Sequence, residues 1–293
     1  MKKTLLATAI AGALGASAAA QAATIYNQDG TQIDLYGNIQ LAYSSVDSAD
    51  GSEDQLHDNG STIGVAGQHI INSGLTGYFK AEWEHDVDEE KIGNGIDTGD
   101  QAYAGLKGNF GDARLGSWDP LIDDWIQDPI TNNEFADVSD SSTDLGGLYP
   151  GSTDALSLDR EGDKVQYMSP SFGGFQFAVG AQYKGDAEGE FEDSVYENQG
   201  SNAAFFGGLK YTIGGFSIAG VYDTLDNYAL TDTATGDVSE AEAYGLTAQY
   251  TINALRLAAK YERTDAEVLG DDAKVDRFGL GARYGYGFGD VYA

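Results

Sequence analysis

Apolar and polar residues alternate along much of the chain, in segments of about ten residues that end at clusters of turn-forming residues. In residues 33–41 (IDLYGNIQL), Ile, Leu and Gly occupy every second position, and Asp, Tyr, Asn and Gln occupy the positions between them. The pattern recurs in residues 75–83, 175–183 and 255–261. Helical spacing never persists for three turns after residue 22, so the chain is predicted to be all-β, with strands that each have one apolar face.

Short and long breaks between these segments alternate along the chain. The short breaks lie at residues 72–74, 110–112, 170–174, 214–215, 253–254 and 287–289. The long breaks lie at residues 46–61, 88–99, 120–158, 185–201, 225–240 and 265–274. Tight turns on one rim and long loops on the other are typical of a transmembrane antiparallel β-barrel. A soluble sandwich would need a second apolar face to pack against, so the barrel is the predicted fold.

The segments give twelve complete strands and, at residues 291–293, the start of a thirteenth. A barrel has to close, because an unpaired edge in hydrocarbon leaves backbone groups unsatisfied at a cost of several kcal/mol each. We therefore expect about 12–13 strands here, in a sequence that is truncated at its C-terminus and lacks the final strands.

The first 22 residues have the features of an export signal. Lys2 and Lys3 form a basic start, residues 5–20 are apolar or small, and Ala20-Gln21-Ala22 gives a small-x-small cleavage pattern. We expect a signal peptide at residues 1–22 and a barrel domain at residues 23–293. No later segment approaches 18 consecutive apolar residues, so no transmembrane helix is expected.

The chain is strongly acidic, with 47 Asp and Glu, 16 Lys and Arg, and a formal net charge of −31. This charge excludes nucleic acid and anionic lipid headgroups as natural partners. The aromatic content of 11% argues against disorder, and acid spread over nearly every loop suits a salt-rich medium. The chain has no Cys, so it has neither disulfides nor thiolate metal sites.

Catalytic and metal-binding patterns are missing from the sequence. His57, His69 and His85 are scattered over a loop, a turn region and a strand end, and no Ser-His-acid set includes them. The acidic segments 94–100 and 232–240 lack the spacing of a calcium-binding loop. We therefore expect no enzymatic activity, no cofactor and no metal.

Four segments, in order and at the right spacing, resemble the general diffusion porins of Gram-negative outer membranes. They are IDLYGNI (33–39), GLTGYFKAEWE (74–84), DQAYAGLKGNFGDARLGSWD (100–119) and VQYMSPSFGGFQFAVGAQY (165–183). The resemblance implies a 16-stranded, water-filled barrel in the cell outer membrane, assembled as a homotrimer and surrounded by outer-membrane lipids. It also implies passage of small hydrophilic solutes and ions, and a third outer loop that folds inward to narrow the lumen.

The break at residues 120–158 is the longest and is the expected constriction loop. No Lys or Arg lies between Arg114 and Arg160, and Trp118 and Trp125 suit a loop that packs against a wall rather than one surrounded by water. The alternative is a solvated loop that is acidic only because the whole protein is acidic. The carboxylates expected at the constriction are Asp119, Asp123, Asp124, Asp128, Glu134 and Asp137.

The basic residues that the family presents opposite this loop are largely replaced. Asn38, Thr62 and Asp100 stand where family members often have Lys or Arg, whereas Arg160 is retained. A charge on the lipid face costs ~2–4 kcal/mol at mid-bilayer, so alternation sends the strand-centre cations inward. The expected inward cations are Lys80, Arg160, Lys164, Arg256, Lys260, Arg277 and Arg283. They either line the neck of the channel or pair with carboxylates above or below it.

These features predict an outer-membrane porin that prefers cations. An adhesin or purely structural barrel is an alternative, but it would need bulky or apolar inward residues to plug the lumen. A substrate-selective porin is a second alternative, because Trp118, Trp125 and Tyr149 could form an aromatic path for a solute.

Overall fold

The structure, a computed structural model, describes residues 22–48, 51–85, 87, 99–126, 129, 162–183, 196–198, 203–226, 230–232, 234–236, 238, 240–268 and 271–293. Its main element is a 14-stranded antiparallel sheet in which every strand pairs with its neighbours along the sheet order. The order is β1 (Ala23–Gln28), β2 (Thr31–Gly37), β5 (Thr62–Asn72), β6 (Leu75–Glu84), β7 (Gly99–Gly108), β8 (Gly111–Ser117), β9 (Lys164–Met168), β10 (Phe175–Tyr183), β12 (Ala203–Ile213), β13 (Phe216–Asp223), β15 (Glu240–Ile252), β16 (Leu255–Val268), β17 (Asp271–Gly285) and β18 (Asp290–Tyr292).

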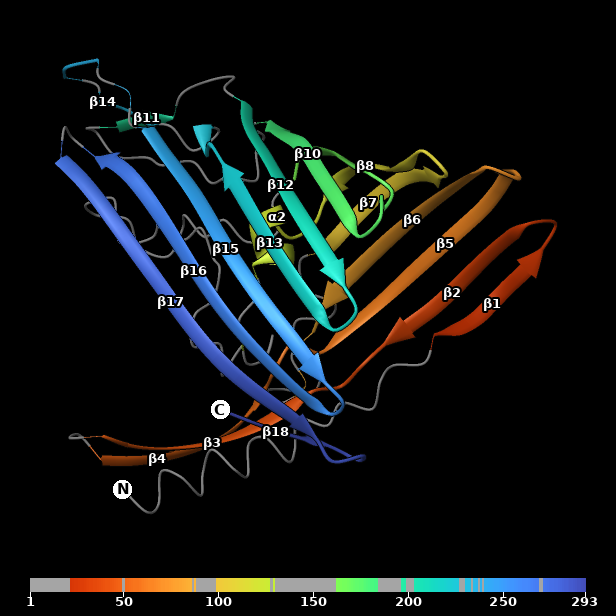
Figure 1. The fold of residues 1–293 in the computed structure, drawn as a ribbon, viewed down its shortest axis with the longest axis horizontal. Helices are drawn as coiled ribbons and strands as arrows, with labels where there is room; N and C mark the ends of the chain where they lie inside the picture. The colour runs from red at the N-terminus through yellow and green to blue at the C-terminus, as the bar shows by residue number, and fades with distance from the viewer. Residues whose placement is uncertain are drawn as a thin grey trace.

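Two strand pairs lie outside the main sheet. One is the hairpin of β3 (Leu41–Ser48) and β4 (Gly51–Asp58), and the other pairs β11 (Tyr196–Asn198) with β14 (Leu230–Asp232). The short helix α2 (Leu121–Trp125) lies within the curve of the main sheet and packs against β12, β13 and β15 (Figure 1). We call the side of the sheet that holds α2 the inner face. Among the described residues, no helix is long and apolar enough to cross a membrane.

The two faces of the sheet differ in the way the alternation predicts. In β10, Phe175 and Val179 point outward and are exposed, whereas Ala178 and Gln182 point inward and are buried. In β17, Leu280 on the outer face is 81% exposed. Large apolar side chains that are exposed all along one face are stabilised by lipid rather than by water, so the all-β membrane-spanning prediction is confirmed.

The apolar outer face ends at a definite row of residues on β15, β16 and β17. The strand register aligns Leu246, Tyr261 and Phe278 in one row, and the next outward-facing row contains Tyr244, Arg263 and Asp276. Arg263 Nε lies 2.7 Å from Asp276 Oδ1. Charged residues on the outer face begin here because the strands continue beyond the hydrocarbon layer.

The twelve predicted strands and the start of the thirteenth all lie in the main sheet, and β1 adds a fourteenth strand that alternation did not reveal. The turn between β1 and β2 is Asp29-Gly30, with φ of 52° and 76°. An Asp-Gly pair with positive φ is typical of a tight hairpin turn, and this signal marks β1.

The long breaks are also more structured than predicted. Residues 46–61 contain part of β3 and all of β4, and residues 265–274 contain the ends of β16 and β17. The apolar alternation of the sequence stops in these stretches, while the backbone ladder continues.

Candidate functional site

The helix α2 places the start of the 120–158 segment on the inner face. Leu121, Ile122 and Ile126 are at most 1% exposed, and they belong to one apolar cluster with inner-face residues of the sheet. The sheet residues in this cluster are Ala178, Phe206, Ala219, Val221, Ala241, Ala243 and Ala266, joined by Leu225 beyond the end of β13. The described part of the predicted constriction loop therefore lies inside the curve of the sheet.

Trp118 fixes the chain just before α2. Its side chain is 1% exposed, with the Arg114 guanidinium carbon 4.3 Å and the Lys164 Nζ 5.2 Å from the ring centroid. Lys164 also donates a hydrogen bond to the Trp118 carbonyl oxygen. Tyr103 packs edge-on against the indole, with the ring centroids 5.9 Å apart. Because Lys164 is only 2% exposed, its ammonium group holds the base of the loop and is covered from the lumen.

Asp124 is the acidic residue of α2 that contacts this cluster. Its Oδ2 lies 3.3 Å from Arg114 Nη2, and its side chain stays 36% exposed. Partial removal from water raises the pKa of the Asp124 carboxyl above its ordinary value of 3.8, the nearby Arg114 lowers it, and the charge of Asp119 raises it. Asp123, on the same helix, is half-buried.

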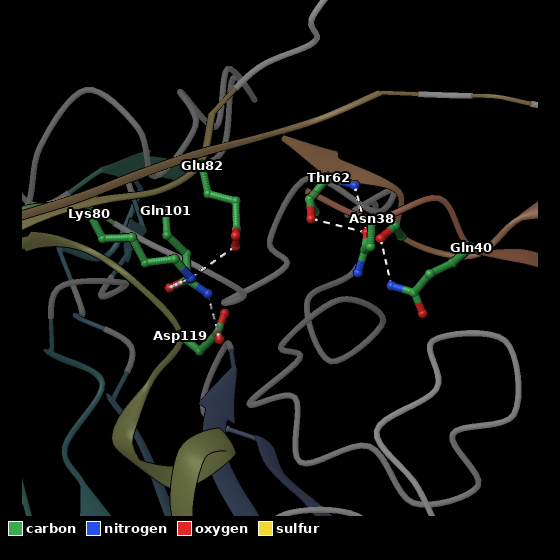
Figure 2. A network of polar contacts seen from close by, with 8 residues as sticks. Asn38, Gln40, Thr62, Lys80, Glu82, Gln101 and Asp119 are labelled. Carbon is green, nitrogen blue, oxygen red and sulfur yellow. Dashed lines mark hydrogen bonds and ion pairs between the residues drawn. The ribbon is translucent and has the colours of Figure 1, made fainter. Parts of the chain in front are cut away.

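A chain of polar contacts joins the strands to Asp119 (Figure 2). Lys80 Nζ on β6 lies 3.0 Å from Glu82 Oε1 and 3.3 Å from Gln101 Oε1 on β7. Gln101 Nε2 in turn donates to Asp119 Oδ2 at 3.1 Å. The positive charge of Lys80 is thus balanced by Glu82 on its own strand, and Asp119 is held by a neutral amide.

Neutral hydrogen-bonding groups gather just beyond the end of β2 and at the start of β5 (Figure 2). Asn38 Oδ1 accepts hydrogen bonds from the Thr62 backbone N, at 3.0 Å, and from Thr62 Oγ1, at 3.2 Å. Gln40 Nε2 donates to the Gly60 carbonyl at 2.9 Å. Asn38 and Thr62 occupy positions where the family resemblance implies basic side chains.

The other predicted inward cations contact partners on β16, β17 and their surroundings. Lys260 and Arg277 each lie 3.4 Å from a carboxylate oxygen of Glu262, and the side chains of Lys260 and Glu262 are fully buried. Arg256 Nη2 donates to the Pro129 carbonyl at 3.1 Å. Arg283 Nη2 lies 2.5 Å from Asp290 Oδ2. These cations therefore support the wall and the loop; Lys260 and Arg277 share Glu262, Arg283 pairs with Asp290, and Arg256 contacts a carbonyl.

Several predicted residues lie outside the described part of the chain. They are Asp128, Glu134, Asp137 and Arg160, together with the side chain of Asp100, whose backbone belongs to β7. Sequence reasoning also missed Arg114, Gln101 and Glu262 as partners of the predicted residues. The alternation within each strand places them inward, but their partners lie on other strands, and only the register brings them together.

Within the described residues, no group of three or more His, Cys, Asp and Glu could hold a metal ion. A spanning sheet with an apolar outer face, a polar inner face and an inward-packed acidic segment defines an outer-membrane channel.

Comparison with known proteins gives the family. A family model described as Gram-negative porin matches residues 7–293. The major outer membrane protein of Halomonas elongata and a monosaccharide porin of a Halomonas species are each 52% identical over 298 residues, covering all of this chain and 78% of theirs. The outer membrane porin PhoE of Escherichia coli is 31% identical and covers 99% of this chain and 80% of its own. The chain belongs to the Gram-negative porin family.

Two solved structures show the same fold. An anion-selective porin from Comamonas acidovorans has a TM-score of 0.62 at 21% identity, covering 88% of this chain and 75% of its own. OmpF of Salmonella typhi, in complex with daunomycin, has a TM-score of 0.62 at 21% identity, covering 92% of this chain and 80% of its own. The protein is an outer-membrane porin, a channel and not an enzyme.

Proposed function

We propose that this porin is a water-filled channel for passive diffusion of small hydrophilic solutes and ions, and that it prefers cations. The observation that carries the proposal is an imbalance of accessible charge on the inner face. Lys164 is covered by Trp118, and the side chain of Lys80, paired with Glu82, is 24% exposed. Asp124 is paired with Arg114, yet its side chain is 36% exposed against 16% for the arginine, and Asp123 is half-buried.

The walls of the channel strengthen the effect of these charges on ions. Low-dielectric walls focus the field of a few charges into the lumen, which raises the local concentration of ions of the opposite sign. Asn38 and Thr62 add no positive charge on the wall formed by β2 and β5. Carboxylates at the start of the loop therefore meet no equivalent accessible cations among the described residues of that wall.

The test is the reversal potential of the protein in a planar bilayer under a potassium chloride gradient. Stepwise conductance with a cation-selective potential is the expected result. Conductance with an anion-selective potential would support the channel and contradict the proposed cation preference. Folded protein that gives no conductance steps would favour the adhesin or structural barrel.

Passage of uncharged sugars is a second candidate function. The observation that favours it is the neutral wall, where Asn38, Gln40, Thr62 and Gln101 offer amide and hydroxyl groups that suit sugar hydroxyls. A relative that is 52% identical and is named as a monosaccharide porin also supports the passage of sugars. Liposome swelling should then be faster in a monosaccharide than in a disaccharide by more than their sizes explain, and an Asn38→Leu variant should lose the excess.

We also propose that the porin works as a homotrimer in contact with outer-membrane lipids. The family resemblance supports the trimer, and the exposed apolar outer face, with Leu209 69% and Phe278 75% exposed, supports the lipid contact. Chemical cross-linking in native membranes should give a species of three times the monomer mass, and a monomer alone would count against the trimer.

A further inference from the structure

The inner face of β10, β12, β13 and β15 has an unusual composition at the level of α2. A wall that faces water needs polar side chains, yet Ala178, Ala219 and Ala243 are at most 2% exposed and belong to one apolar cluster with the helix. Gly208 on β12 and Gly245 on β15 share this face. These alanines and glycines leave room for the helix to approach the wall closely. Their small size therefore suits contact with the helix and not contact with a solute.

The position of α2 depends on the absence of a Cβ atom at two glycines. A Cβ added at Gly245 would lie 2.8 Å from Ile126 Cγ2 and 2.9 Å from Ile126 Cγ1. A Cβ added at Gly208 would lie 2.9 Å from Trp125 Cε3 and 3.0 Å from the Gly220 carbonyl oxygen. Ordinary van der Waals contact begins near 3.4 Å, so a single methyl group at either position requires a shift.

When a side chain is added at residue 245, the helix has to move, because neither Ile126 nor the strand can give way. Ile126 is 0% exposed and belongs to the same close-packed cluster as Ile122 and Leu121, so its side chain has no free space to turn into. The strand that carries Gly245 is held on both sides, by β13 and by β16. A larger side chain at residue 245 therefore moves α2 away from the wall and into the lumen.

We propose that Gly245 and Gly208 are positioning residues that set how closely α2 sits against the inner wall, and thereby the width of the channel beside it. Neither glycine contacts the permeating solute, and both act through Ile126 and Trp125. The proposal rests on the channel itself and holds whichever ion the channel prefers.

The first test compares Gly245→Val with a matched control, Gly220→Val, on the adjacent strand. Gly220 faces outward, and a Cβ there would lie 3.7 Å from its nearest neighbours, in ordinary contact. Single-channel conductance of Gly245→Val should fall by about a quarter or more, because conductance follows the open cross-section, and that of Gly220→Val should equal the wild type. Equal conductance in all three proteins would overturn the proposal.

A rescue experiment separates positioning from general damage and avoids the larger substitution. Gly245→Ala should lower the conductance, and adding Ile126→Ala should restore it, because this removes both Cγ atoms and leaves Cβ 3.3 Å from the new methyl group. A double variant that stays as low as Gly245→Ala would overturn the proposal. Wild-type protein is measured first, so failure of the channel function itself appears before any variant is compared. The reversal potential, recorded for each variant, reports the ion preference separately from the width.

Discussion

At the scale of single residues, burial decides which charges can act on a permeating ion. Lys164 and Asp124 lie near one another around Arg114 and Trp118, yet Lys164 is 2% exposed and the Asp124 side chain 36%. The covered ammonium group stabilises the base of the loop, and the half-exposed carboxylate faces the lumen water. Asp124 is therefore a residue where protonation should change both the field and the stability.

The cation preference should weaken as the pH falls, beginning at a higher pH than ordinary carboxyl groups would give. Folding raises the pKa of Asp124 above 3.8, so this carboxylate takes up its proton early in an acid titration. Reversal potentials of the wild type and of Asp124→Asn, measured from neutral to acidic pH, check this. The variant should start with a weaker preference and lack the early phase, and Asp29→Asn, in the turn at the other rim, should titrate like the wild type.

The raised pKa of Asp124 also determines how this group changes the free energy of unfolding with pH. Between 3.8 and the raised value, the folded protein holds a proton at Asp124 that the unfolded chain has released. The contribution of this group to stability is therefore present at low pH and falls as the pH rises through that window.

Restoring a cation on the neutral wall should reduce the cation preference. Thr62→Arg places a guanidinium beside Asn38 and should lower the cation-to-anion permeability ratio about twofold or more. Thr76→Arg, on the same face but next to the turn after β5, is the matched control and should have a smaller effect. A ratio that is unchanged in Thr62→Arg would contradict the argument from the wall charge.

At the scale of elements, the alternation of apolar and polar residues predicted the strands well where one face meets lipid. It failed where the alternation stops, in the β3–β4 hairpin and at the ends of β16 and β17, because hydrophobic periodicity reports burial and not backbone pairing. Site partners were harder to predict. The inward direction of Gln101 follows from its strand, but its contacts with Lys80 and Asp119 depend on the register between strands and on the path of the chain after β8.

The segment before α2 should lose stability when its aromatic anchor is removed. Trp118→Ala leaves a cavity between Arg114, Lys164 and Tyr103, and a buried Trp-to-Ala change typically costs about 3–5 kcal/mol. Unfolding in urea from lipid vesicles should show the loss, with a smaller loss for Trp118→Phe. Trp83→Ala, on the half-buried outer face of β6, should also cost less. If Trp118→Ala were no less stable than Trp83→Ala, the anchoring role would be wrong.

At the scale of the whole molecule, the sheet divides two solvents. Row by row, its outer face changes from apolar to charged between Leu246–Tyr261–Phe278 and Tyr244–Arg263–Asp276, and its inner face stays polar except beneath α2. The register therefore fixes the depth of the protein in the membrane, because a shift by one residue would reverse both faces at once.

A charge should be tolerated on one face of the sheet and not on the other. Ala248→Arg lies on the apolar outer face between Leu246 and Tyr250 and should lower the free energy of unfolding in vesicles by about 2–4 kcal/mol. Gln68→Arg, on the inner face of β5 near Asp34, should change it by less than about 1 kcal/mol. Similar losses for the two variants would contradict the assignment of the faces.

The docking of α2 has a consequence for the order in which the molecule can fold. The strands of the main sheet follow the order of the chain and each pairs with its neighbours in that order, so the sheet can grow strand by strand. The helix at residues 121–125 behaves differently, because its cluster includes Ala243 and Ala266, which follow it by more than a hundred residues. The helix cannot make its full set of contacts until β15 and β16 have formed, so we expect it to dock late, after most of the wall exists.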